Sequence, residues 1–387
     1  MADEPTRGNV FATGNLAPAC STLMPFLFRH LFAGRLAGIL LMTLVTATAQ
    51  PTAGWKLLPP IPDAIGYAGM AAGVVGGRLV AAGGSQWDRP IWLNGTRSFT
   101  DRLFVLDAPD GTWRTATARL PLPSGHFASA SADGAIYLAG GNCATGSLAT
   151  VYVIKPDGDD LRLERLPDLP APTGYAAAAV AGGRLFVIGG VPDPASKAAR
   201  REVWSLDLRA PVAWKREADL PGAGVIVPAA AGQGEALFVF GGVAFGADGK
   251  PVPSHAACRL PRAGDQWEIL PDLPEPRVGI ASPCPVLADG TIWLIGGYAE
   301  IWGGVQREHP GFSVQTLKLD PARRTWSPGP VLPREGELNR DSATDPGPLP
   351  MIGAPVVIWR DRVVIVGGEV RVATRTPAVL SWPLCND

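Results

Sequence analysis

A short apolar run that ends in Gly-Gly recurs six times along the chain. In the first copy, Arg78 is followed by Leu-Val-Ala-Ala and then by Gly83-Gly84. Apolar runs of this length, bounded by glycine, predict strands that are buried on both faces. The six copies span residues 78–84, 135–141, 184–190, 236–242, 291–297 and 362–368.

The spacing of these copies predicts the architecture. The first glycines of successive pairs are 57, 49, 52, 55 and 71 residues apart. A second apolar strand follows the pair in most units, then a Trp that marks an outer strand, and then a Pro-containing turn. A repeat near fifty residues built from short strands is typical of kelch-type propellers. We therefore predict an all-β protein, a six-bladed kelch-type β-propeller. The second strands are expected at 102–107, 150–155, 202–208 and 314–320, and the outer-strand residues are Trp113, Leu163, Trp214, Trp267 and Trp326.

The last unit lacks an outer strand of its own. After Gly367-Gly368 there is room for one strand near 378–382, and then the chain ends. The segment Trp55-Lys-Leu-Leu-Pro59 carries the same signature and is otherwise unused. We expect this N-terminal strand to complete the last blade, because that removes the open sheet edge between the first and last blades.

The first 49 residues have the pattern of a leader. Arg29 and Arg35 precede the apolar run 36–45, and Ala47-Thr-Ala49 follows it as a small-residue cleavage site. This order predicts a secretory signal peptide over residues 1–49, with Met24 as an alternative start, and a propeller over residues 50–387. The location is then periplasmic or secreted, with no membrane attachment after leader removal. A membrane anchor is the alternative, although the run is short for a bilayer.

Composition narrows the function classes. With 47% hydrophobic residues, 47 Gly and 39 Pro, the chain is folded and rich in turns. A formal net charge of -1 gives no basic surface for nucleic acid. No Cys-x-x-Cys pair supports a zinc site, and no metal or organic cofactor is expected. The four cysteines after the leader either form two disulfide bridges or stay as buried thiols; they are Cys143, Cys258, Cys284 and Cys385. No feature of the sequence specifies an oligomeric state.

A four-stranded meander places two sets of loops at one mouth of the central channel. One set precedes the innermost strands, and the other follows each Gly-Gly pair. Loops of such a scaffold carry function. In the last unit, Glu369, Arg371 and Arg375 lie in one short loop of this kind. Salt bridges between long loops are the alternative explanation for the charges of this region, and the spacing alone favours them. The further binding candidates near the mouth are Arg277, Arg307, Glu308, His309, Tyr67 and Trp92.

The last unit also carries a family resemblance. Gly368-Glu369, followed by Arg375-Thr376, resembles the Gly-Glu-x5-Arg-Thr motif of the kelch-type N-acetylneuraminate epimerases, the sialic acid mutarotases, in their cyclically permuted subgroup. The segments 309–312 and 68–73 are also similar to that subgroup. The resemblance implies catalytic roles for Glu369 and Arg375. The chain departs from the family at Val372-Ala373, where Pro-Gly is common, and in an insertion over 334–350 that is able to cover the mouth.

The implied chemistry is anomer exchange of a small sugar acid. The anomeric hydroxyl loses a proton, the ring oxygen gains one, and the open-chain carbonyl rotates before the ring closes again. One carboxylate, here Glu369, can act as base and then as acid. Arg375 either binds the sugar carboxylate or stabilises charge on oxygen, and Arg371 and His309 are secondary candidates.

Three other functions fit a propeller. A copper radical oxidase needs several His and Tyr ligands, but the three histidines after the leader lie in separate units. A sialidase needs a cluster of arginines and repeated Asp boxes, of which residues 110–113 are a single fragment. A non-catalytic module that binds carbohydrate or protein through its loops is the main rival, because fold does not determine function.

Overall fold

The structure, a computed structural model, describes residues 54–334, 341–345, 347 and 349–384. Contacts within the chain separate Met1–Thr48 from Ala49–Asp387. The predicted leader, the start at Met24 and Cys385 lie outside the described residues. Within the described ranges the helices are two short 3-10 turns, η1 (Ile91–Leu93) and η2 (Gln306–Glu308), and none could cross a membrane.

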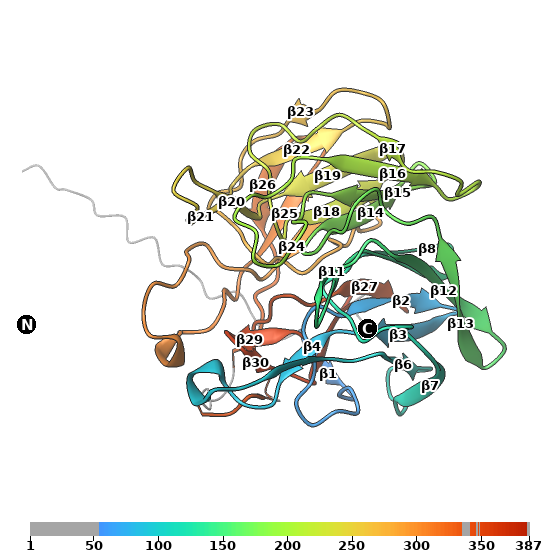
Figure 1. Ribbon diagram of the computed structural model, residues 1–387, viewed down its shortest axis with the longest axis vertical. Helices are drawn as coiled ribbons and strands as arrows, with labels where there is room; N and C mark the ends of the chain where they lie inside the picture. Colours follow the sequence, from blue (N-terminus) through green and yellow to red (C-terminus); the bar gives the residue numbers. More distant parts are fainter. Residues whose placement is uncertain (1–53, 335–340, 346, 348, 385–387) are drawn as a thin grey trace, which may run out of the picture. The chain divides into compact units, whose positions relative to one another are not determined.

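The strands form a six-bladed β-propeller, as the repeat predicts (Figure 1). Blade 1 has β2 (Ala71–Val75), β3 (Arg78–Ala82), β6 (Arg102–Leu106) and β7 (Arg114–Arg119); blade 2 has β8 (Ala128–Ala132), β9 (Ala135–Ala139), β12 (Val151–Asp157) and β13 (Asp160–Leu166). Blade 3 has β14 (Ala177–Ala181), β15 (Arg184–Ile188), β16 (Val203–Asp207) and β17 (Lys215–Arg216); blade 4 has β18 (Ala229–Gln233), β19 (Ala236–Phe240), β22 (Ala257–Leu260) and β23 (Glu268–Ile269). Blade 5 has β24 (Ile292–Ile295), β25 (Thr316–Asp320) and β26 (Thr325–Pro328); blade 6 has β27 (Val356–Trp359), β28 (Arg362–Val366), β31 (Val379–Pro383) and β1 (Lys56–Leu58).

The described part of blade 5 has three strands instead of the expected four. The inner position is taken by a segment that contains Pro283 and Pro285. Proline has no N–H to donate to a strand ladder, so a regular inner strand cannot form there. The segment still joins its neighbour, since the Cys284 N–H donates to the Ala230 carbonyl of blade 4 at 2.8 Å.

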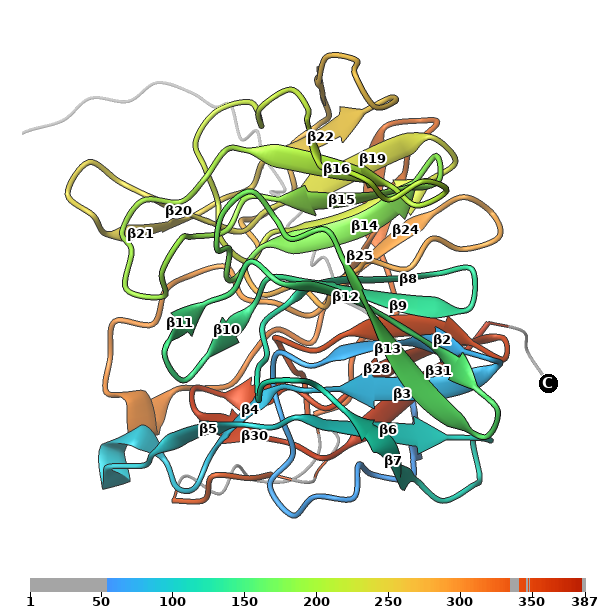
Figure 2. The same ribbon diagram turned by 45° about the vertical axis from the view of Figure 1, so that its right-hand side comes forward.

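Blade 6 contains strands from both ends of the described chain. β1 pairs antiparallel with β31, with Lys56 opposite Ser381 and Leu58 opposite Val379. β27 in turn lies next to β2 of blade 1. Figures 1 and 2 both show the red strands of blade 6 beside the blue strands of blade 1. Phe104 of blade 1 and Trp359 of blade 6 belong to one buried cluster, so the core here lies between the sheets.

The recurring Trp has a structural explanation. Its indole N–H donates to a backbone carbonyl in the turn that leaves the preceding blade. Because an unpaired carbonyl in such a place is costly, this bond fixes each outer strand to its neighbour. The four bonds run from Trp113 to Pro59 at 2.7 Å, Trp214 to Pro167 at 2.8 Å, Trp267 to Ala218 at 2.9 Å and Trp326 to Pro271 at 2.9 Å.

The two predicted loop sets do meet. In each blade, a residue before the innermost strand, or before the segment that replaces it, forms an isolated antiparallel bridge with a residue just after Gly-Gly. All six bridges therefore lie on one face of the propeller. The pairs are Ala68–Ser85, Gly125–Asn142, Gly174–Val191, Ile226–Val243, Val278–Tyr298 and Ile352–Glu369.

Candidate functional site

Glu369 and Arg375 face each other across a small hairpin. β29 (Glu369–Arg371) pairs with β30 (Thr374–Arg375), and Glu369 lies directly opposite Arg375. The Arg375 Nη1 donates to the Glu369 Oε2, forming an ion pair. The Arg375 side chain is only 3% exposed, whereas that of Glu369 is 19% exposed. The carboxylate is therefore the accessible member of the pair.

The turn of this hairpin holds the second carboxylate oxygen. The Ala373 N–H donates to the Glu369 Oε1 at 2.9 Å. Ala373 has a φ of 58°, a left-handed conformation that glycine adopts most readily. Both Glu369 oxygens are thus fixed, and each keeps a lone pair for another partner.

The hairpin is extended by described residues of the 334–350 insertion. The Arg375 N–H donates to the Ala343 carbonyl at 2.8 Å, and the Asp345 N–H donates to the Arg375 carbonyl at 2.9 Å. Thr344 Oγ1 also donates to the Ile65 carbonyl at 3.0 Å. This part of the insertion lies beside β30. Residues 335–340 fall outside the described residues.

Arg375 also bonds to blade 1, where a second polar cluster begins. Its Nε donates to the Ser85 carbonyl in β4 (Ser85–Trp87) at 3.0 Å. The Ser85 hydroxyl lies 3.0 Å from the His126 Nε2 and accepts a bond from the Arg97 Nε at 3.2 Å. Arg97, in β5 (Arg97–Phe99), further donates to the Tyr175 hydroxyl at 3.3 Å. Blades 6, 1, 2 and 3 thus supply one connected group.

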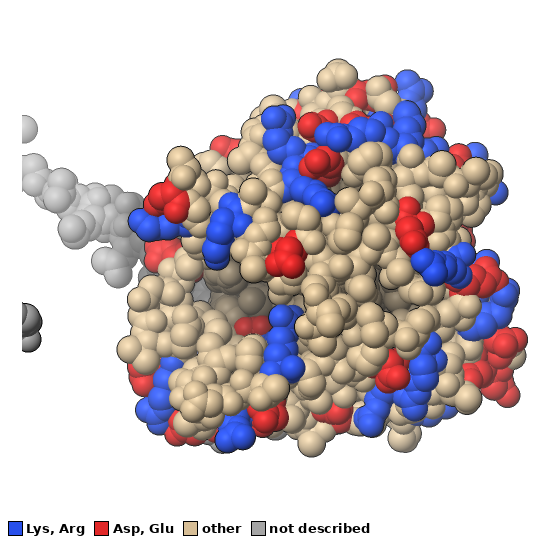
Figure 3. Space-filling view, in the orientation of Figure 1, with Lys and Arg blue, Asp and Glu red and all other residues tan. Residues whose placement is uncertain are grey.

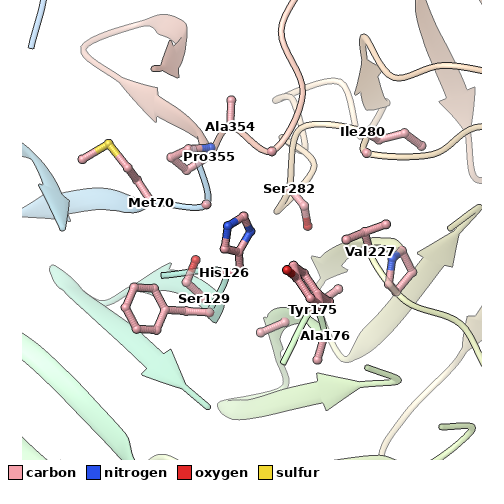
Figure 4. A pocket seen from close by; sticks show the side chains of 17 residues that line it. Met70, His126, Ser129, Tyr175, Ala176, Val227, Ile280, Ser282, Ala354 and Pro355 are labelled. Carbon is pink, nitrogen blue, oxygen red and sulfur yellow. The ribbon is translucent and has the colours of Figure 1, made fainter. Parts of the chain in front are cut away.

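One residue in each blade, just before the innermost position, has a positive φ and lines the same axial cavity of about 90 Å³. Figure 4 shows the rings of His126 and Tyr175 beside this cavity, with Ser129, Ser282 and Val227. Left-handed backbone is costly for side chains other than glycine, and residues held there cluster at functional sites. The six residues are Gly69 (φ 68°), His126 (55°), Tyr175 (57°), Val227 (45°), Gly279 (65°) and Gly353 (57°).

The charges of this cluster set its protonation states. Burial, and then the nearby Arg97 and Arg375 cations, hold the pKa of His126 well below its ordinary 6.5, so its imidazole is neutral at neutral pH. Burial also lowers the pKa of Arg375, and the Glu369 carboxylate opposes that shift. Because guanidinium pKa values start above 12, Arg375 stays charged.

Glu369 also lines a second, aromatic pocket of about 170 Å³. Four aromatic side chains line it, namely Tyr298, Trp302, His309 and Phe312. Their ring centroids are 5.7 Å apart for Tyr298–Phe312 and 5.1 Å for His309–Phe312. Burial and the Glu369 charge raise the pKa of Tyr298 to about 12, so its phenol stays protonated. The pocket therefore offers apolar walls and a hydroxyl next to a carboxylate.

Several predicted residues lie around these pockets. His309 is buried, lines the aromatic pocket, and accepts a bond from the Gly311 N–H at its Nδ1 at 3.0 Å. Burial and then the Arg371 charge lower its pKa. Arg371 is fully buried, donates to Thr374 Oγ1 at 3.2 Å, and lies 5.3 Å above the ring of Trp92. Arg371 thus bonds within the hairpin, whereas His309 lines the pocket next to it.

Arg307 and Glu308 lie in η2, between Gln306 and His309 of the aromatic pocket. Arg307 makes two hydrogen bonds to the Asp341 carboxylate, both 2.8 Å, and is 3.6 Å from the Glu308 carboxylate. The Arg307 and Asp341 side chains are about half exposed. This is a salt bridge between two long loops, of the kind expected as the alternative to a binding role.

Arg277 and Tyr67 have structural partners in blades 5 and 1. The Arg277 guanidinium is buried and donates to the Gly296 carbonyl at 2.9 Å and to Glu275 at 2.6 Å. The Tyr67 hydroxyl donates to Asp63 at 2.6 Å, and its ring packs on Phe104. Neither residue is among those that line the two pockets described above.

Four polar residues of the axial cluster were not among the predicted site residues, namely Ser85, Arg97, His126 and Tyr175, although the segments with His126 and Tyr175 belong to the loops expected at the mouth. The available signal was the repeat itself. His126 and Tyr175 occupy the position that is Gly69 in blade 1, Gly279 in blade 5 and Gly353 in blade 6. Side chains that replace a repeated glycine next to the channel would have singled them out.

The cysteines and the acidic residues give no sign of a metal centre in the described part. Cys143, Cys258 and Cys284 are buried free thiols, which fits the second of the two expected alternatives for these three. Burial raises the pKa of the Cys258 thiol to about 12. Among residues 54–334 and the later described positions, no group of three His, Cys, Asp or Glu side chains is arranged to hold a metal.

The chain is similar to one curated protein of named activity. It shares 25% identity over 209 residues with an N-acetylneuraminate epimerase of Pasteurella multocida, and the match covers 48% of this chain. The chain spans about half of that relative's length, 51%. No protein-family model matches the sequence.

Proposed function

We propose that this protein accelerates the interconversion of the α and β anomers of a sialic acid such as N-acetylneuraminate. The observation that carries the proposal is the Glu369–Arg375 pair at the mouth of the channel, beside the aromatic pocket. The distant similarity to an N-acetylneuraminate epimerase supports the same chemistry. We further propose that a leader over residues 1–49 exports the protein, so that it acts in the periplasm or outside the cell.

Glu369 has the geometry of a proton shuttle. Its oxygens are fixed by the Ala373 N–H and by Arg375, while 19% of the side chain stays accessible. The carboxylate takes the proton of the anomeric hydroxyl as the bond from the anomeric carbon to the ring oxygen breaks. It then returns that proton to the ring oxygen, which leaves an open-chain carbonyl. Rotation about the adjacent carbon–carbon bond and the reverse steps give the other anomer.

Arg375 acts mainly on Glu369 in this scheme. Its Nη1 and Nε are engaged by Glu369 and by the Ser85 carbonyl, so the guanidinium orients the carboxylate. It also places positive charge next to the oxygens that change protonation. The protonated Tyr298 phenol and the aromatic walls suit the mixed polar and apolar surface of an N-acetylated sugar.

Proton NMR of freshly released α-N-acetylneuraminate tests the proposal. We expect the wild-type protein to speed the appearance of the β anomer, and Glu369→Gln to lose about 100-fold or more of that acceleration. Gln keeps an oxygen that can accept the Ala373 N–H. The matched control is Glu217→Gln in blade 3, which removes a buried carboxylate bonded to Ser205 and Gly264.

Two results would contradict the proposal. Wild-type protein that accelerates no sialic acid would favour a non-catalytic carbohydrate-binding module. Full activity of Glu369→Gln would show that another group transfers the proton.

A further inference from the structure

Arg97 bonds to Tyr175, which lines the axial cavity, and the groups that accept its hydrogen bonds are neutral. Its Nε donates to the Ser85 hydroxyl at 3.2 Å, and its Nη1 donates to the Tyr175 hydroxyl at 3.3 Å. Its guanidinium carbon lies 4.8 Å from the centroid of the Phe99 ring. A guanidinium has five N–H groups, and these two bonds leave three of them for another acceptor. Among the described residues, no carboxylate lies within salt-bridge distance of Arg97.

Other arginines of this face do have carboxylate partners. Arg375 pairs with Glu369, Arg307 with Asp341, and Arg277 with Glu275. Arg97 is only partly buried and is held by hydroxyls that fix its direction without neutralising it. A guanidinium without a carboxylate partner suits a planar oxyanion, because it can bind both oxygens at once.

The charges around Arg97 add up to an excess of positive charge. Arg97 and Arg375 are both cations, and Glu369 is the one carboxylate among the described residues that bonds to this cluster. His126 is neutral because its pKa is depressed. The two guanidiniums are close enough that Arg97 lowers the pKa of Arg375. Figure 3 shows the surface hollowed next to β29 and β4, with acidic and basic groups at the edge of the hollow. An anion would relieve this repulsion.

We propose that Arg97 binds the carboxylate of the substrate and restricts the site to sugar acids whose carboxylate is attached to the anomeric carbon. This inference rests on the proposed function. In such a sugar, the carboxylate lies one bond from the carbon whose hydroxyl Glu369 must reach. The anion anchor must therefore be next to the base, and Arg97 is connected to Glu369 through only Ser85 and Arg375. A sugar acid whose carboxylate is attached to a different ring carbon, as in glucuronate, is not expected to reach both groups.

The test measures binding and anomer exchange separately. Calorimetric titration compares N-acetylneuraminate, its methyl ester and glucuronate, and the NMR assay uses the first two. We expect wild-type protein to prefer the acid to the ester by about 10- to 100-fold, the usual value of a hydrogen bond to a charged group. Arg97→Gln should abolish that preference, and Arg97→Lys should retain part of it. The control is Arg119→Gln, on an exposed position of the outer strand β7.

The outcomes separate this inference from the proposed function. If wild-type protein binds the acid in an Arg97-dependent way without exchanging anomers, the anchor stands and the proposed function fails. If Arg97→Gln still prefers the acid to the ester, the anchor is wrong while the mutarotase activity stands. Tight binding of glucuronate would overturn the restriction to anomeric carboxylates. Should Arg97→Gln fail to fold, the salt dependence of wild-type affinity decides, since only the acid should bind more weakly at high salt.

Discussion

The Glu369–Arg375 pair can be tested as a unit, independently of any substrate. Arg375 is 3% exposed and Glu369 19% exposed, so both charges are largely removed from water. Removing one partner of a buried pair costs roughly 3 to 5 kcal/mol, because the other charge stays buried without compensation. We expect about 3 kcal/mol for Glu369→Gln, the lower end, because the Glu369 site keeps some solvent. Gln also still accepts the Ala373 N–H.

Arg375→Met leaves the opposite defect. The Glu369 carboxylate loses its counter-charge but keeps the Ala373 N–H, and the Ser85 carbonyl keeps the Ala68 N–H at 3.0 Å. We expect a cost of about 2 to 3 kcal/mol. The double variant has no unpaired charge in this pair. It should therefore be about 2 kcal/mol more stable than the sum of the two single costs predicts, a coupling typical of contacting residues.

Urea unfolding followed by tryptophan fluorescence measures these free energies, and coincident circular dichroism checks that the transition is two-state. The matched control combines Arg375→Met with Glu217→Gln. Glu217 is a buried carboxylate of blade 3 with its own partners, Ser205 and Gly264, so these two costs should add within about 0.5 kcal/mol. A coupling between Glu369 and Arg375 no larger than that of the control pair would refute the reasoning.

Two further predictions concern the backbone and the pH. Ala373→Gly should leave the protein as stable or raise its unfolding free energy by up to about 1 kcal/mol, because Ala373 has a φ of 58°; a clear loss of stability in urea unfolding would contradict this. His126 has a depressed pKa in the folded state, so its contribution to stability is complete above pH 6.5 and is lost as the pH falls below that value. Between pH 7.5 and 5.5, His126→Gln should lose about 1 kcal/mol less unfolding free energy than wild-type protein, and parallel pH curves for the two proteins would rule out this assignment.

The repeat could be predicted from the sequence because its signals recur along the chain. The Gly-Gly pairs, the apolar runs before them and the outer Trp residues are local signals, and the structure gives each a local reason. The Trp113 bond to Pro59 is one example. Pro283 and Pro285 also indicated that blade 5 lacks a regular inner strand. The prediction of six equal four-stranded units did not take these two prolines into account.

The candidate site could be predicted only where it is local. Glu369 and Arg375 are six residues apart in one hairpin, so their motif survives in the sequence. Arg277 and Tyr67 were chosen for their position near the mouth, and in the structure they bond to Glu275 and Asp63, which lie close to them in the chain. No pattern of spacing distinguishes a buried arginine with backbone partners from one that faces a cavity.

The axial cluster was not predictable in the same way because its members come from three different blades. Ser85 and Arg97 lie in the hairpin of blade 1, His126 before β8 of blade 2, and Tyr175 before β14 of blade 3. They are brought together by the angular position of their blades around the axis, which no single stretch of sequence records.

The Arg375–Ser85 bond crosses the junction between the last and first blades, so the site depends on how those two sheets meet. At this junction, β27 lies beside β2, and the turn after β1 receives the Trp113 indole N–H. A change that loosens β1 would touch no residue of the site, yet it would weaken the contact that holds the blade 6 hairpin against β4. The relative position of Glu369 and Arg97 is set by that junction. The pairing of β1 with β31 therefore contributes indirectly to the geometry of the site, through the junction of blades 6 and 1.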